Sequence, residues 1–126
     1  MEEIKNNTTE QDKEYEVAKA EAEADKSNVA YIHFFRKPFE WEGKEYKSLT
    51  FDFDKLTGED SLSIEAELQA KGISVLVPAF SGHFLIRMAA RVCNERLGVD
   101  AFQKMPMREF LRIRTKARNF LMESEQ

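Results

Sequence analysis

Two histidines and one cysteine carry the strongest catalytic or metal-binding chemistry available to this chain. His83 and Cys93 are ten residues apart in a segment whose apolar spacing predicts one helix. That separation is nearly three helical turns, about 15 Å. The two side chains therefore cannot bind one ion together, and a zinc ion would need carboxylates to complete four ligands. We predict no metal site and no cofactor.

A nucleophilic pair of Cys93 with a histidine would require an adjacent imidazole and a third, orienting group. The helical separation argues against His83, which we expect at the surface or in the first turn of its helix. Nothing in the sequence places His33 beside the thiol. We interpret Cys93 as a small buried hydrophobic residue on the same helical face as Leu85 and Met88.

Carboxylates and glycines add no catalytic pattern. Acids such as Asp52 and Asp54 lie two apart on a predicted strand, where they share a solvated face. The five glycines are scattered at positions 43, 58, 72, 82 and 98, so there is no glycine-rich phosphate loop. The sequence predicts no catalytic residues, and we expect a binding protein and not an enzyme.

A basic segment near the C-terminus is the strongest candidate for function. Arg108, Arg112 and Lys116 follow one another at intervals of four residues, and Arg114 and Arg118 do the same. The two rows border an apolar stripe made of Phe110, Ile113, Ala117, Phe120 and Leu121. The candidate partner-binding residues are Arg108, Phe110, Arg112, Ile113, Lys116 and Phe120.

Three interpretations of this basic segment compete: a solvated helix face, a nucleic-acid patch and a docking surface for a protein. The isoelectric point of the whole chain, about 5.3, argues against nucleic acid. Phe102, Met105, Met107 and Met122 lie near the same helix and favour an adaptable protein surface. The same residues could equally complete the core.

Length and charge define the domain organisation. The 126 residues, 42% hydrophobic and 33% charged, suffice for one folded domain with a polar surface. Residues 1–30 hold nine acids and four lysines, and the remainder holds fourteen acids and fifteen basic residues. We predict a disordered acidic leader at 1–30, a domain at 31–122 and a disordered end at 123–126.

Apolar runs are short throughout the sequence. None approaches the roughly 18–20 residues that a membrane span requires, and the N-terminus carries acids where a signal peptide has basic and apolar regions. One cysteine allows no intrachain disulfide. We expect no membrane association and a cytoplasmic location.

The element pattern predicts an α+β fold. The sequence indicates an antiparallel β-hairpin. Its first arm is the segment 31–40, which is rich in aromatic residues, its turn is at 41–44 with Gly43, and its second arm is the alternating segment 45–53. Pro38 fits an edge strand or the end of the first arm. Helices are expected at about 59–71, 82–97 and 106–122, and residues 73–78 form either a third short strand or a buried connection. About three helices would then pack on the hairpin.

Several short motifs recur in an order that matches a known family. They are Lys37-Pro38, Gly43-Lys44 leading into Leu49-Thr50-Phe51, Thr57-Gly58 with Asp60, Met105-Pro106, Phe110 and Asn119-Phe120-Leu121. Their order resembles that of the phage tail assembly chaperones, small proteins encoded beside the tape measure gene of long-tailed phages and prophages. The resemblance covers about 34–122 and rests on order and spacing, because each motif is short.

The resemblance implies a chaperone that coats the largely helical, hydrophobic tape measure protein during virion morphogenesis. The chaperone would keep this partner soluble until tail tube subunits polymerise around it. In such families a programmed frameshift often adds a C-terminal extension that recruits tail tube protein. The acidic leader is outside the pattern, and self-association is left open. The alternative function is a small nucleic-acid-associated protein that uses the basic C-terminal helix.

Overall fold

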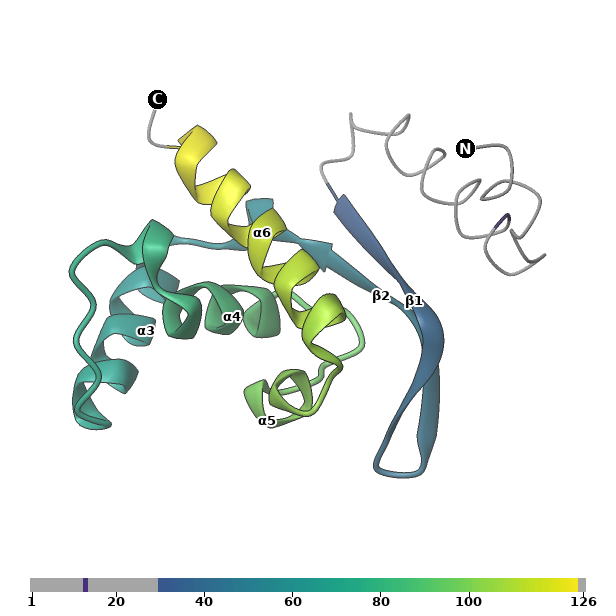
Figure 1. Ribbon diagram of the computed structural model, residues 1–126. Helices are drawn as coiled ribbons and strands as arrows, with labels where there is room; N and C mark the ends of the chain where they lie inside the picture. The colour runs from purple at the N-terminus through teal and green to yellow at the C-terminus, as the bar shows by residue number, and fades with distance from the viewer. Residues whose placement is uncertain (1–12, 14–29, 125–126) are drawn as a thin grey trace, which may run out of the picture.

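The computed structural model describes residue 13 and residues 30–124, which form the predicted α+β fold. Within that part, two antiparallel strands precede four α-helices, one more than predicted, and two short 3-10 helices (Figure 1). The elements are β1 Ala30–Trp41, β2 Lys44–Asp52, η2 Phe53–Lys55, α3 Gly58–Ala70, η3 Pro78–Phe80, α4 Gly82–Arg91, α5 Val99–Gln103 and α6 Met107–Ser124. The predicted disordered leader lies almost wholly outside the described residues, as do 125–126.

The hairpin forms where it was predicted, with its turn at Glu42 and Gly43. Both residues have positive φ, 49° and 80°, as a two-residue turn matched to the twist of the strands requires. The pairing is irregular farther from the turn, because Phe34 pairs with Ser48 whereas Phe39 pairs with Tyr46. The extra residues on β1 between these pairs include Pro38, which has no N–H for a regular ladder.

Helix α3 begins with the predicted cap. The Thr57 side chain accepts from the backbone N–H of Asp60, and the Asp60 carboxylate accepts from the backbone N–H of Thr57 at 2.8 Å. The Thr57 backbone hydrogen bond is the main reason that the pKa of Asp60 lies below its usual value. Beyond the other end, Gly72 takes a positive φ of 74°, and the helix stops close to the predicted residue.

Residues 73–77 form no strand but a partly buried connection, in which Ile73 and Val75 pack against the core while Leu76 is 95% exposed. The second edge of β2 is occupied by residues 92–94 instead. The backbone N–H of Asn94 donates to the Thr50 carbonyl at 2.9 Å, and Phe51 forms an isolated bridge with Cys93. The segment predicted as a possible third strand is therefore not the one that pairs with the hairpin.

The same pairing explains why α4 is shorter than predicted. The helix ends at Arg91 and not near residue 97, because the Val92 carbonyl accepts from the backbone N–H of Asp52 at 3.4 Å. Arg96 then adopts a positive φ of 61°, which ends any helical continuation. The apolar spacing continues to Leu97 because the chain still packs on the core beyond the helix end.

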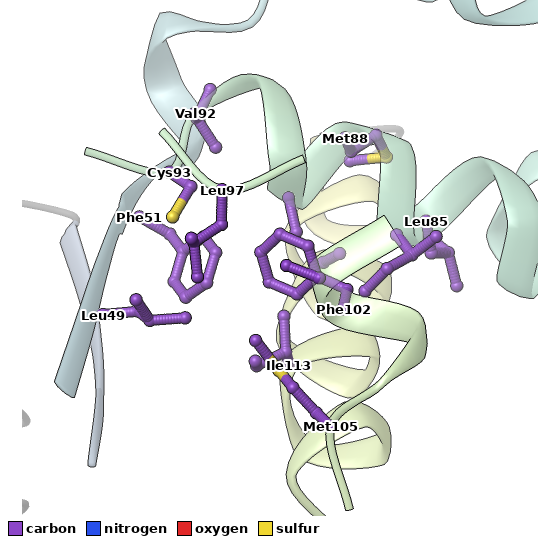
Figure 2. Packing of buried hydrophobic residues seen from close by; sticks show 14 of the residues in the cluster. Leu49, Phe51, Leu85, Met88, Val92, Cys93, Leu97, Phe102, Met105 and Ile113 are labelled. Carbon is purple, nitrogen blue, oxygen red and sulfur yellow. The ribbon is translucent and has the colours of Figure 1, made fainter. Parts of the chain in front are cut away.

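The core lies between the hairpin and the helices, which gather to one side of it (Figure 1). Phe102, on the unpredicted short helix α5, is fully buried and lies 6.0 Å from Phe51 between ring centroids. Figure 2 shows Phe102 between the side chains of β2 and Leu85 of α4, with Ile113 of α6 beneath it. No described helix is long and apolar enough to cross a membrane.

Candidate partner-binding surface

The inner face of α6 fixes which side of this helix a partner could reach. Ile113 and Ala117 are fully buried, and Phe110, Phe120 and Leu121 pack against the core from partly buried positions. The Phe120 ring stacks on Phe53 of η2 with centroids 5.6 Å apart. The predicted apolar stripe is therefore real, and it faces the domain's own core.

A buried polar chain joins the same face of α6 to β1. The His33 Nε2 atom lies 2.8 Å from Glu109 Oε1, and the Tyr31 hydroxyl lies 2.8 Å from His33 Nδ1. Because a carboxylate only accepts, Nε2 carries a proton and donates to Glu109, and the Tyr31 hydroxyl forms a hydrogen bond with the other ring nitrogen. The backbone N–H of Arg36 donates to Glu109 Oε2 at 3.2 Å.

The hydrogen bonds of this polar group keep Glu109 ionised, although its exposed fraction is 4%. Burial alone would raise its pKa, but the hydrogen bonds from His33 and Arg36, with the charges of His33 and Arg112, hold the pKa below its usual value. Sequence reasoning missed this contact, because His33 and Glu109 are 76 residues apart and neither belongs to a motif. Glu109 and His33 are 4% and 0% exposed, so this hydrogen-bonded group connects α6 to β1 and is not a site open to a ligand.

The candidate residues divide between the two faces of α6. Ile113 belongs to the core, whereas Phe110 and Phe120 are partly exposed beside it. Lys116 is exposed, with its Nζ 5.2 Å from the centroid of the Tyr31 ring. Of the other two candidates, Arg108 is exposed and Arg112 is partly buried. The structure thus brings the basic candidates to the surface and turns most of the apolar ones inward.

The outward side of α6 carries a different set of apolar residues. Met107, Leu111 and Met122 are 75%, 36% and 46% exposed. Their spacing of four and eleven residues puts them on one side of the helix, opposite Ile113. The two basic rows border this side. We define the outer face of α6 as Met107, Arg108, Leu111, Arg112, Arg114, Lys116, Arg118 and Met122.

The cations of α6 differ from those of α4 in how they are paired. Arg87 donates from Nε to Glu67 of α3 at 2.6 Å, and Arg91 donates to Asp60 at 3.1 Å. Within the described residues, no carboxylate lies at ion-pair distance from Arg108, Arg114 or Arg118. The arginines of α4 therefore form ion pairs with α3, whereas Arg108, Arg114 and Arg118 are available to a partner.

The other reactive side chains do not gather into a site. Cys93 is 5% exposed, and burial raises the pKa of its thiol, as expected for a core residue. His83 is exposed in the first turn of α4. Among residues 13 and 30–124, no three side chains of His, Cys, Asp or Glu are grouped as metal ligands would be.

Comparison with known proteins does not extend this description. Neither the protein-family models nor the curated proteins nor the solved structures contain a match to this chain.

Proposed function

We propose that this protein is a non-enzymatic tail assembly chaperone of a phage or prophage, acting in the host cytoplasm. In this role it binds the tape measure protein and keeps it soluble while the tail is built. The observation that carries the proposal is the outer face of α6, where Met107 and Leu111 are exposed beside Arg108, Arg114 and Arg118, and no described carboxylate lies at ion-pair distance from these three arginines.

The chemistry of that face supports an amphipathic helix as the partner. Exposed thioethers and leucine take up apolar side chains of varied shape, and arginines attract carboxylates beside them. A tape measure protein, which the family resemblance describes as largely helical and hydrophobic, has many segments of that kind. A tail tube protein would join through a frameshifted extension, beyond the contacts argued here.

The resemblance agrees with the fold at two points. Gly43-Lys44 lies at the hairpin turn, and Thr57 with Asp60 forms the cap of α3. Turns and caps of this type occur in many folds, so these motifs support the architecture more than the function. The weight of the proposal therefore rests on the outer face of α6.

Nucleic acid is the alternative partner, and the same face argues against it. Phosphate recognition needs cations and polar donors, whereas Met107 and Met122 offer apolar surface between the two basic rows. Such a mixture suits a protein helix better than a phosphate backbone.

Co-expression tests the proposal. The tape measure protein encoded by the same phage or prophage is produced with and without this chain, and its soluble fraction is measured. We expect this chain to raise the soluble fraction and to co-purify with the tape measure protein. An insoluble partner in both cases, with nucleic acid retained by this chain at about 0.15 M salt, would favour the alternative.

A further inference from the structure

A second apolar surface, formed by exposed side chains of the loop before η3 and of η3 itself, lies next to α6. Leu76, Val77 and Phe80 are 95%, 48% and 75% exposed, the first two in the loop before η3 and the third at its end. Ala79, between them, is 5% exposed and anchors η3, which contacts both α4 and α6. The loop is therefore held in place while its large side chains point away from the core.

This loop adjoins the basic edge of the outer face. A Cβ atom on Gly82, two residues after Phe80, would lie 3.7 Å from Cδ and Nη1 of Arg114. Arg118 follows Arg114 by one helical turn on the same side. Arg114 thus lies against the start of α4, two residues beyond Phe80, and Leu111 lies one helical turn before Arg114 on α6.

Charge on this combined surface has one sign. The sequence holds no Asp or Glu between Gly72 and Asn94. The single acid of α6 between Arg108 and Arg118 is Glu109, which is buried against His33. A partner with carboxylates would be attracted along the part of this surface between the loop and Arg118, whereas the exposed Glu123 lies just beyond Met122 at its end.

We propose that Leu76, Val77 and Phe80 form, with the outer face of α6, one docking surface for an amphipathic helix whose apolar ridge is bordered by carboxylates. The ridge packs on Phe80 and Leu111, and the carboxylates reach Arg114 and Arg118. Helices of this kind place anchors three, four and seven residues apart, which allows contacts on both sides of a basic row. This inference rests on the proposed function, because it specifies how the chaperone holds its partner.

Designed peptides test the inference without a natural partner. Two synthetic amphipathic helices share one leucine ridge, bordered in one by glutamates and in the other by lysines, and their affinities for the full chain are measured by fluorescence anisotropy. We expect the glutamate peptide to bind at least about tenfold more tightly than the lysine peptide. Equal affinities would overturn the inference.

The variant Leu76→Ser with Phe80→Ser tests the apolar half of the surface. Both side chains are exposed, so the fold should be retained. The single variant Leu76→Ser is included so that the test still stands if the substitution at Phe80 impairs folding. The control is Leu62→Ser on α3, where a leucine is 69% exposed. We expect the double variant to bind the glutamate peptide about tenfold more weakly, Leu76→Ser to weaken it in the same direction, and the control to match the wild type.

The outcomes separate the two proposals. Unchanged binding by both Leu76→Ser and the double variant would overturn the docking surface, even where co-expression still solubilises the tape measure protein. Peptide binding that follows the expected pattern, with no effect on the tape measure protein, would contradict the proposed function alone. Concentration-dependent self-association that the double variant abolishes, without peptide binding, would show that a second copy covers the loop and would also overturn the inference.

Discussion

At the scale of single residues, Glu109 connects α6 to the hairpin. Its carboxylate accepts from His33 and from the backbone of Arg36, and its exposed fraction is 4%. Glu109→Ala would leave two donors without partners and open a small cavity. We expect it to lower the free energy of unfolding by roughly 2–4 kcal/mol in urea denaturation.

The matched control is Glu65→Ala, which removes an exposed helical glutamate from α3. It should change the free energy of unfolding by less than about 0.5 kcal/mol. Similar losses for the two variants would show that the buried chain contributes little to stability.

Acid should weaken the same contact. The pKa of Glu109 is lowered in the folded protein from its usual value of 4.5, so the carboxylate's stabilisation is complete above that value. It is lost as the pH falls through the lower, folded pKa, where His33 and Arg112 face a neutral carboxyl group. We therefore expect the stability difference between wild type and Glu109→Gln to shrink below about pH 4.5.

Asp60 also has a lowered pKa, but it is present in both proteins and cancels in the comparison. Urea denaturation of both proteins at a series of pH values measures the difference directly. A difference that stays constant down to about pH 3 would contradict the assignment of the carboxylate as the stabilising form.

At the scale of elements, two arginines join α4 to α3 in unequal environments. Arg87 is 6% exposed and depends on Glu67, whereas the side chain of Arg91 is 31% exposed and pairs with Asp60. Glu67→Ala would leave the Arg87 guanidinium buried without its carboxylate. We expect a loss of roughly 1–3 kcal/mol in thermal or urea unfolding.

Arg91→Ala serves as the comparison, because a solvent-screened pair is worth less than about 1 kcal/mol. The account requires the Glu67 variant to lose more stability than the Arg91 variant. The reverse order would mean that burial of Arg87 does not set the strength of this contact.

Turns and helix ends that depend on neighbouring residues alone could be predicted from the sequence. The hairpin turn follows from Gly43, and the start of α3 from Thr57 and Asp60, because each signal acts within a few residues. The end of α4 could not, because it depends on hydrogen bonds between Val92 or Asn94 and the distant strand β2. A helical apolar pattern predicts burial correctly even where tertiary pairing replaces the helix, as at Cys93.

The candidate residues named from the sequence lie on one helix, α6, but on both of its faces. Periodicity identified the stripe containing Ile113, and it cannot tell whether a stripe meets the core or a partner. That distinction needed the exposed fractions of Met107 and Leu111, which sit between the same basic rows on the opposite side.

At the scale of the whole molecule, charge is separated across the helices. Helix α3 has acids and no lysine or arginine, α6 is rich in arginine, and α4 contacts both (Figure 1). Two acids of α3, Asp60 and Glu67, pair with α4, whereas Arg108 is exposed, Arg114 and Arg118 are partly exposed, and no described carboxylate lies at ion-pair distance from these three. The domain therefore presents a basic, partly apolar side, which is the central claim about its function.

The most direct test of that claim is a binding titration with a helical segment of the tape measure protein from the same phage or prophage. Affinity is measured for the wild type, for Arg114→Glu with Arg118→Glu, and for a control of equal charge change on the hairpin, Lys37→Glu with Lys47→Glu. All four side chains lie at least partly exposed, so folding should be retained.

We expect the α6 variant to bind at least about tenfold more weakly than the wild type and the hairpin control to stay within about twofold. Higher salt should weaken wild-type binding, because the attracting charges are partly exposed and salt screens them. Equal affinities for the wild type and the α6 variant would contradict the assignment of this face as the binding surface.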